Sequence, residues 1–260
     1  MKRYKAFAKV NIFLKITGTR GDYHELISRF MRVENLYDEL YFAPKEKEGF
    51  EIRGQFSCTT EQNTIYKAYK ALLEATESEA LEKLMQKYAI VVEKHIPAFA
   101  GLGGGSSDAA TYLKMCNEVL HLGLSRCELA AIGMRVGADV AFFIYDYASA
   151  NVSGIGEIVE EFQEPLLELE VVTPKIEIST PKVYKSYRAN FFAPISADES
   201  AKLASMSSSE ILKSMKVDEA NDLFKPALHE YKELKDHYRH GWFFSGSGSS
   251  FFRIKDNMHG

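Results

Sequence analysis

The sequence predicts an α+β fold built from two domains. Segments with strand-like alternation and segments with helical periodicity are mixed along the chain, without the regular strand–helix alternation of a parallel α/β sheet. With 260 residues, of which 46% are hydrophobic, the chain can bury one large core or two modest ones. We place the boundary near residue 160, which predicts domains at residues 1–160 and 161–260.

The first half is expected to open with a strand over residues 4–16. Apolar residues at the even positions 10 to 16 alternate there with mostly polar residues at odd positions, the period of two typical of a strand. Gly137 sits where a left-handed helix terminus is expected. The other predicted elements of this half are a turn at 18–22, strands at 30–42 and 90–93, helices at 63–74, 107–121 and 126–135, and a hairpin within 142–162.

The second half is expected to open with two strands and to continue with helices. A Ser-Gly-Ser-Gly turn at residues 245–248 then lies between two apolar, β-rich segments, which predicts a pair of strands around a turn. The predicted elements are strands at 169–173 and 175–178, helices at 181–188, 198–204, 208–215 and 226–239, and strands at 242–244 and 250–254.

Composition excludes several classes of protein. The formal net charge is −4 and the basic residues are dispersed, so nucleic acid is not an expected partner. Cys58, Cys116 and Cys127 are odd in number and far apart, which favours free thiols in a reducing compartment over disulfides or zinc. Lysines interrupt the apolar residues near the N-terminus, so no signal peptide or membrane span is expected and we predict a cytoplasmic protein. The oligomeric state stays open.

Residues 101–108, Gly-Leu-Gly-Gly-Gly-Ser-Ser-Asp, form the densest glycine cluster of the chain. Each glycine costs about 0.5–1 kcal/mol relative to alanine inside regular structure, so the cluster requires a reason such as close approach of the backbone to a ligand. An alanine-rich segment with helical periodicity follows at once. A glycine loop that enters a helix collects unpaired N–H donors and the positive end of the helix dipole, which together favour phosphate.

Three other interpretations of this loop are less favoured. A Walker loop requires a lysine directly after its last glycine, and Ser106 follows Gly105 instead. The dinucleotide-binding fingerprint requires a third glycine where Ser106 stands and an acidic residue about twenty positions later, where only Glu128 is near. A flexible linker would not continue into an apolar helical pattern.

Three further segments could supply chemistry, and each also has a plainer interpretation. Lys9 and Asn11 project to the same face of the first strand, either as a solvated face or as a cation and an amide that stabilise phosphoryl transfer. Asp139 precedes an apolar run, either as a helix cap or as a carboxylate that takes a hydroxyl proton, with Lys9 as its natural partner. Tyr23 and His24 follow the first strand, either as packing residues or as a pair suited to a nucleobase.

The glycine loop, together with Pro97-Ala-Phe-Ala before it and Ala-Ala after it, resembles the loop of the GHMP kinases, named after galacto-, homoserine, mevalonate and phosphomevalonate kinases. Taken with the other segments, nearly the full length is similar to the branch that phosphorylates 4-diphosphocytidyl-2-C-methyl-D-erythritol. The segments that carry this resemblance are residues 8–18, 22–26, 97–110, 137–140, 154–157, 178–181 with Tyr184, 221–223 and 245–248.

The resemblance implies a fold and an activity. The fold is a ribosomal protein S5 domain 2-like N-terminal domain, which binds ATP and catalyses the reaction, with a ferredoxin-like C-terminal domain. The activity is ATP-dependent phosphorylation of the substrate's 2-hydroxyl, a step of the non-mevalonate route to isoprenoid precursors. Mg²⁺ is expected because ATP reaches kinases as its magnesium complex, although no carboxylate cluster dedicated to a metal is evident.

The resemblance also implies roles for individual residues. Asp139 is the implied base, Lys9 its charge partner, and Asn11 the residue that positions the acceptor. The residues implied to bind the substrate are Tyr23 and Tyr184 around the cytosine, His24 at its edge, Thr180, Gly246 and Gly248. Those implied to bind ATP are Pro97, Ala98, Phe99, Ala100, Gly101, Leu102, Gly103, Gly104, Gly105, Ser106 and Ser107, with Lys94 and Asn63 near the adenine.

The chain departs from the family pattern at three places. Phe7 replaces a usual proline, and Phe99 and Ala100 stand where the family usually has glycine, so we expect a stiffer front of the loop. The turn before Tyr23 is one residue shorter than usual. The alternatives to this assignment are a GHMP kinase for another alcohol and a relative that binds ligand without catalysis.

Overall fold

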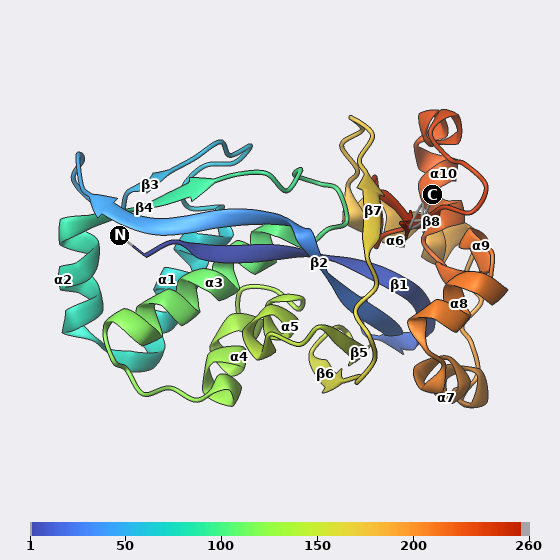
Figure 1. Ribbon diagram of the computed structural model, residues 1–260, viewed down its shortest axis with the longest axis horizontal. Coiled ribbons are helices and arrows are strands. Elements are labelled where there is room, and N and C mark those ends of the chain that lie inside the picture. Colours follow the sequence, from blue (N-terminus) through green and yellow to red (C-terminus); the bar gives the residue numbers. More distant parts are fainter. Residues whose placement is uncertain (1, 256–260) are drawn as a thin grey trace, which may run out of the picture. The chain divides into compact units, whose positions relative to one another are not determined.

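The computed structural model describes residues 2–255, which divide into two compact units (Figure 1). The first unit comprises the segment that ends at Ala8, Glu34–Ala98 and Gly103–Asp146. The second comprises Lys9–Val33, Phe99–Leu102 and the segment from Tyr147 onward. The units are interleaved along the chain, and the expected domain boundary near residue 160 stays a prediction.

Two long strands, β1 (Tyr4–Arg20) and β2 (Tyr23–Pro44), contribute residues to both units. They pair with each other and are joined by a two-residue turn in which Gly21 has a φ of +59°. Glycine suits this turn because short hairpin loops require a positive φ. All residues from Ala8 to Leu14 are buried, so both faces of β1 are covered there.

The first unit combines part of β2 with helices. The end of β2 pairs antiparallel with β4 (Tyr88–Glu93), with Glu39 opposite Glu93, and β3 (Ile52–Arg53) pairs parallel with β4. In Figure 1 the helices lie on one face of these strands. The helices are α1 (Thr64–Thr76), α2 (Glu79–Lys87), α3 (Gly104–Val119), α4 (Arg126–Met134) and α5 (Val140–Tyr145), and α3 packs against α1, α4 and α5.

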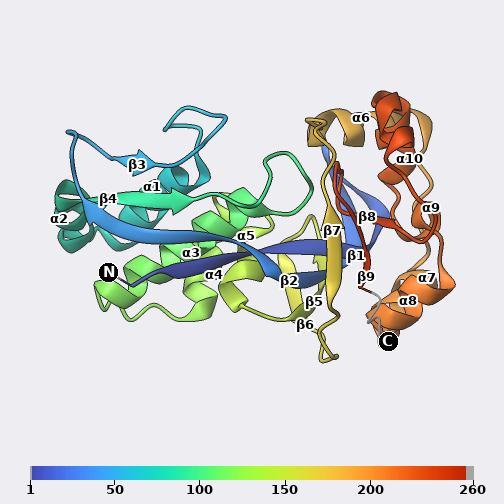
Figure 2. The same ribbon diagram turned by 45° about the horizontal axis from the view of Figure 1, so that its top comes forward.

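The second unit holds the other part of β2 and a separate small sheet. Leu26–Met31 of β2 pair antiparallel with β5 (Ser149–Gly154), which pairs with β6 (Ile158–Glu161). The small sheet has the order β7 (Leu169–Val172), β9 (Phe251–Ile254), β8 (Phe243–Phe244), and Figure 2 shows these strands side by side. The helices of this unit are α6 (Thr180–Asn190), α7 (Ala197–Ser205), α8 (Ser208–Ser214), α9 (Val217–Ala220), α10 (Phe224–Glu230) and a 3₁₀ helix at Lys232–Asp236.

Most of the predicted elements are confirmed, and four predictions are wrong. Residues 142–145 belong to helix α5, which is buried all round and so carries no periodicity to separate it from a strand. No strand forms at 175–178 in the described part of the chain, where Ile178 is instead a buried core residue. The segment 226–239 is divided at Tyr231, and Gly137 is not among the described glycines with a positive φ. Helix α2, which Ser78 caps, was not predicted.

Within residues 2–255, no helix is both long enough and apolar enough to cross a bilayer.

Candidate active site

Helix α3 begins directly at the glycine loop. Gly103 is its N-cap residue with a φ of +70° and has no side chain that could cap the helix, so the first backbone N–H groups of α3 are suited to an anion. Close packing requires the next glycine, because a Cβ atom on Gly104 would lie 2.9 Å from Cγ2 of Ile96. Thr64 on α1 donates a hydrogen bond of 2.6 Å to the carbonyl of Gly105. The first unit thus holds the helical side of a phosphate loop in place.

The front of the loop, Phe99–Leu102, belongs to the second unit and is fastened there. The carbonyl of Leu102 accepts a hydrogen bond from the backbone N–H of Lys9 at 3.0 Å. The hydroxyl of Ser245 donates to the carbonyl of Gly101 at 2.9 Å. Gly101 has a φ of +73°, and a Cβ atom there would lie 2.1 Å from the Ser245 carbonyl oxygen, so only glycine fits.

Phe99 adopts a backbone conformation that favours glycine. Its φ is +53°, a strained value for a bulky residue, and its side chain is exposed. Ala100 beside it is buried, and its carbonyl accepts a hydrogen bond from the N–H of Ser250 at 3.1 Å. The loop front therefore retains a glycine-like path, with the strain placed at Phe99.

Lys9 and Asn11 are buried, so the interpretation of this pair as a solvated face is wrong. Their exposed fractions are 4% and 2%. The Nζ atom of Lys9 donates to Oδ1 of Asn11 at 2.7 Å and lies 4.4 Å from the centre of the Phe30 ring. A buried ammonium is unfavourable unless it is paired, which makes this pair a strong candidate for chemistry.

Asp139 occupies the N-cap position of α5 but does not cap the helix. Its backbone is in the right-handed helical region, and its side chain makes no capping hydrogen bond to the described first turn of α5. A Cβ atom on Gly137 would lie 3.8 Å from the hydroxyl oxygen of Ser106. The segment that carries Asp139 therefore lies beside a serine of the phosphate loop, within the first unit.

His24 lies in an aromatic group that suits a planar ligand. Its ring centre is 5.2 Å from that of Tyr184 and 5.7 Å from that of Tyr187. Burial, and then the charge of Arg188, lower the pKa of His24 below its ordinary value, which favours the neutral ring. Among the described residues, Nε2 of His24 has no hydrogen-bond partner although it is buried. Tyr23 is 66% exposed, and a sandwich of Tyr23 and Tyr184 around a base stays a prediction.

The second glycine turn, residues 245–250, is buried and lies beside Asn11 and Gly101. A Cβ atom on Gly246 would lie 3.4 Å from Oδ1 of Asn11 and 3.4 Å from the carbonyl oxygen of Gly101. The side-chain amide of Asn221 donates to the carbonyls of Phe244 and Gly246 at 2.8 and 2.9 Å. The hydroxyls of Thr180 and Ser247, next to Gly246, lie 2.7 Å apart.

Lys94 is held between two buried carboxylates in the first unit. Its Nζ atom contacts Asp38 and lies 2.7 Å from Oδ2 of Asp108. Burial lowers the pKa of Lys94, but the two carboxylates outweigh it and raise the pKa overall. Asp38 also accepts hydrogen bonds from the backbone N–H groups of His95 and Ile96, at 2.5 and 2.8 Å. Asn63 caps α1 through a 2.9 Å bond from the N–H of Ile65. The adenine contacts expected of Lys94 and Asn63 stay predictions.

Comparison with known proteins identifies the family of this chain. The model of the GHMP kinases N terminal domain matches residues 63–147. A 4-diphosphocytidyl-2-C-methyl-D-erythritol kinase from Sulfurimonas denitrificans is 66% identical over 260 residues, which cover 98% of each chain. This chain belongs to that kinase family. A kinase of the same name from a Sulfurovum species is 46% identical and covers 98% of this chain and 100% of the relative.

Solved structures agree with this family. The crystal structure of a 4-(cytidine 5′-diphospho)-2C-methyl-D-erythritol kinase matches with a TM-score of 0.74 and 30% identity, covering 98% of this chain and 90% of that one. The α+β GHMP kinase fold expected from the sequence is confirmed. The chain is a small-molecule kinase, and ATP is its phosphate donor.

The candidate site also contains residues to which sequence reasoning assigned no role. Ser28 binds Asn11 and Asp38 contacts Lys94, whereas Ser245 and Asn221 were included in the resemblance without a role. Their signal in the sequence is weak, because a lone serine or aspartate in a strand-like or turn-like segment is common. Only pairing between distant segments brings these residues to the candidate site.

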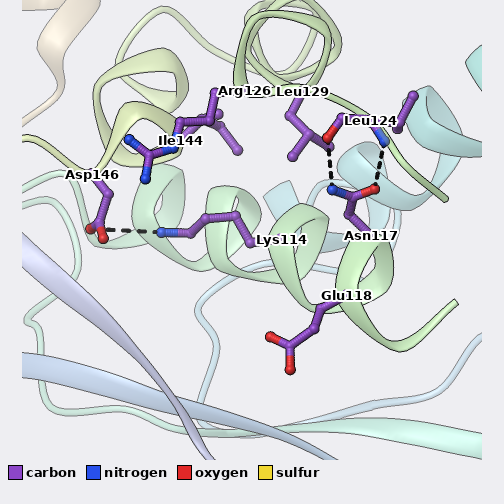
Figure 3. Close-up of a pocket in the computed structure, with 8 residues that line it drawn as sticks. All are labelled: Lys114, Asn117, Glu118, Leu124, Arg126, Leu129, Ile144 and Asp146. Carbon is purple, nitrogen blue, oxygen red and sulfur yellow. Dashed lines mark hydrogen bonds and ion pairs between the residues drawn. The ribbon is translucent and has the colours of Figure 1, made fainter. Parts of the chain in front are cut away.

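Figure 3 shows a cavity of about 220 Å³ that lies apart from the phosphate loop. Lys114 on its wall is ten residues beyond Gly104 in α3, about 15 Å along the helix. In Figure 3 the Lys114 side chain points toward Asp146, at 3.8 Å, and the amide of Asn117 faces the backbone of Leu124. These contacts are internal, so we assign the cavity no part in phosphoryl transfer.

Proposed function

We propose that this chain transfers the γ-phosphate of ATP to the 2-hydroxyl of 4-diphosphocytidyl-2-C-methyl-D-erythritol, giving the 2-phosphate and ADP. This reaction belongs to the non-mevalonate route to isoprenoid precursors. The observation that carries the proposal is the 66% identity, over nearly the whole chain, to a protein named for this activity. The buried Lys9–Asn11 pair and the glycine loop supply chemistry that fits it.

The loop residues from Pro97 to Ser107 are proposed to hold the ATP phosphates through backbone N–H groups and the N-terminus of α3. Within residues 2–255 there is no group of three or more His, Cys, Asp or Glu side chains that could hold a metal ion. The described residues therefore fit a Mg²⁺ ion that is held mainly by the ATP phosphates, as is common for this ion. When bound, Mg²⁺ would neutralise charge on the transferred phosphoryl group.

Asp139 is proposed to take the proton of the acceptor hydroxyl. The hydroxyl oxygen then forms a bond to the γ-phosphorus while the bond between that phosphorus and the ADP oxygen breaks. Lys9 is proposed to stabilise the charge at this oxygen, and Asn11 to orient Lys9 and the acceptor. Asp139 belongs to the first unit and Lys9 to the second, so their pairing is part of the proposal.

The cytosine is proposed to lie against Tyr184 and Tyr23, with His24 at its edge. The buried Nε2 of His24, which has no hydrogen-bond partner within residues 2–255, supports this placement, since a neutral imidazole offers both a donor and an acceptor to a base. Thr180, Gly246 and Gly248 are proposed to face the rest of the acceptor. Lys94 and Asn63 are proposed to lie near the adenine.

The test is release of ADP from ATP, Mg²⁺ and the cytidylyl substrate by the purified chain. We expect turnover that falls by about 10²–10⁴-fold in Asp139→Asn, the usual contribution of a general base. Asp146→Asn is the matched control, because Asp146 ends the same helix in a left-handed conformation that asparagine tolerates. Equal rates for the two variants would overturn the assigned base, and absence of turnover by the unaltered chain would overturn the proposed reaction.

A further inference from the structure

The geometry points to Ser28 as a positioning residue that acts through Asn11 on the ammonium of Lys9. The inference rests on the proposed function, because it assigns Ser28 a role in the reaction that Lys9 supports. Ser28 is fully buried on β2, and sequence reasoning gave it no part in the site.

Strand β2 provides the platform for this contact. Side chains two apart on a strand share a face, so His24, Ser28 and Phe30 project from the same face of β2. Two of them reach the reactive side chains of the neighbouring strand β1. The Nδ2 atom of Asn11 donates to the Ser28 hydroxyl at 2.9 Å, and the ring of Phe30 lies 4.4 Å from Nζ of Lys9.

The hydroxyl of Ser28 is oriented by a further bond. It donates its single proton to the backbone carbonyl of Phe13 at 2.5 Å. A serine hydroxyl has one proton, so toward Asn11 it can only accept. Asn11 must therefore present its NH₂ group to Ser28, which turns Oδ1 toward Lys9.

The result is a chain of donors that runs in one direction, from Lys9 to Asn11 to Ser28 to the Phe13 carbonyl. An ammonium only donates, so it can bond to Oδ1 of Asn11 but not to its NH₂ group. If the amide turned by half a rotation, two donors would face each other in a buried site where water cannot compensate. Lys9 and the Ser28 hydroxyl thus hold the amide of Asn11 from its two ends, and the amide fixes one N–H of Lys9.

The backbone of Asn11 is held separately from its side chain. Its N–H donates to the Ser245 hydroxyl at 3.3 Å, and Ser245 donates to the Gly101 carbonyl at 2.9 Å. Removal of the Ser28 hydroxyl therefore frees the amide of Asn11 and the carbonyl of Phe13, while the contact with Ser245 still holds the backbone of Asn11. This separation makes Ser28→Ala a test of orientation and not of folding.

The experiment compares Ser28→Ala with Ser28→Thr, which keeps the hydroxyl and suits a strand. Ser149→Ala is the matched control, because Ser149 is a buried serine of the adjacent strand β5 whose hydroxyl donates to Glu164 at 2.7 Å, away from Asn11. We expect kcat to fall about tenfold in Ser28→Ala, in line with loss of a buried hydrogen bond. KM for ATP should stay within about twofold, and the threonine and control variants should keep kcat within about threefold.

A double-mutant cycle separates action through Asn11 from a general effect. In an Asn11→Ala background, Ser28→Ala should lower kcat no further, since the amide that it orients is absent. An unchanged kcat in Ser28→Ala, or a full additional loss in the double variant, would overturn the inference. Both outcomes differ from absence of turnover in the unaltered chain, which would contradict the proposed reaction instead.

A measurement without turnover tests the same contact. The side-chain amide protons of Asn11, assigned by their loss in Asn11→Ala, should show nuclear Overhauser effects to the β-protons of Ser28. Two separated, slowly exchanging amide signals are expected in the unaltered chain, and exchange broadening is expected in Ser28→Ala. Lack of the Overhauser effects would show that the amide does not face Ser28, and the inference would be wrong whatever the enzyme's rate.

Discussion

Asp108, in the second turn of α3, carries a buried carboxyl group whose ionisation is unfavourable. Burial raises its pKa to about 7, even though Lys94 lies 2.7 Å away and opposes the shift. Among the described residues, its Oδ1 atom has no hydrogen-bond partner. Lys94 must serve Asp38 as well, which leaves one buried negative charge without a balancing cation when both carboxyls are ionised.

Asp108→Asn should therefore stabilise the chain at alkaline pH. The folded pKa of about 7 lies above the ordinary value of 3.8, so between these pH values the folded chain holds a proton that the unfolded chain has lost. The free energy of unfolding then falls as pH rises through this window, and asparagine removes the fall. We expect the difference in Tm between Asp108→Asn and the unaltered chain to be larger at about pH 8 than at about pH 5, by roughly 2–4 °C or more.

The Tm difference at the lower pH serves as the control for the difference at the higher pH. A gain or loss in Tm that is the same at both would show that the Asp108 side chain acts through packing and not through its charge. Thermal unfolding in matched buffers measures this directly.

His24 is a second residue whose contacts lead to a specific expectation. His24→Phe keeps a buried aromatic ring but removes both ring nitrogens. We expect KM for the cytidylyl substrate to rise about tenfold, since loss of one neutral hydrogen bond to a ligand is worth about 0.5–1.5 kcal/mol. KM for ATP should not change. Because the pKa of His24 is lowered, KM for the substrate should also stay constant as pH falls to about 6.5.

His237→Gln supplies the control for this prediction, because His237 is exposed at the end of the 3₁₀ helix. If His24→Phe raised KM for ATP as much as KM for the substrate, the base-recognition role of His24 would be wrong. Steady-state kinetics with each substrate varied in turn give the answer.

Sequence reasoning selected Lys9, Asn11 and Asp139 as candidates because their residue types stand out against apolar surroundings. It did not select Ser28 or Asp38, which join the candidate site only through partners on other segments. These partners are Asn11 for Ser28 and Lys94 for Asp38. Pairing between strands cannot be read from one strand's own pattern. The same limit led to the interpretation of Lys9 and Asn11 as a solvated face, because nothing in β1 itself shows that both of its faces are covered.

At the scale of elements, the glycine loop depends on a close approach between two turns. Gly101→Ala places a Cβ atom 2.1 Å from the Ser245 carbonyl oxygen, so one of the two turns must move. Gly123→Ala is a matched control, because its φ of +70° is similar to that of Gly101 but nothing lies within 4 Å of its Cβ position. In each variant the left-handed conformation costs the alanine about 1–2 kcal/mol, and only Gly101→Ala adds a steric clash.

We expect Gly123→Ala to keep its KM for ATP and Gly101→Ala to raise it at least about tenfold, since the loop front must shift away from the phosphates. Gly101→Ala should also have the lower Tm. Equal KM values and equal Tm values for the two variants would contradict the close approach. Calorimetry and ATP-dependent kinetics together measure both quantities.

The predicted elements were confirmed where a periodic pattern extends over many residues, and they were wrong where an element is short or fully buried. The strand β1 and the helices α1, α3 and α4 have clear patterns and were predicted. Helix α5 is six residues long and apolar throughout, so neither length nor period distinguished it from a strand. The segment 226–239 has a helical pattern, but Tyr231 leaves the helical region and divides it.

At the scale of the whole molecule, the interleaved units could not be predicted from the sequence. β1 and β2 pass through both units, and the residues of the glycine loop are divided between them. A composition shift marks a boundary only where one domain ends before the next begins, which is not the arrangement of these compact units. The family and its fold were nevertheless predictable, because the matching segments keep their order over nearly the full length.

The central claim is that this chain moves a phosphoryl group from ATP to one hydroxyl of a cytidine-diphosphate-linked alcohol. The measurement that tests it most directly is ³¹P nuclear magnetic resonance of a reaction with ATP, Mg²⁺ and that substrate. The account predicts a new phosphomonoester signal on the 2-hydroxyl, in equal amount to ADP, which forms far more slowly with Lys9→Ala or Asp139→Asn. ADP formed with free phosphate alone, or a phosphomonoester formed by both variants as fast as by the unaltered chain, would contradict it.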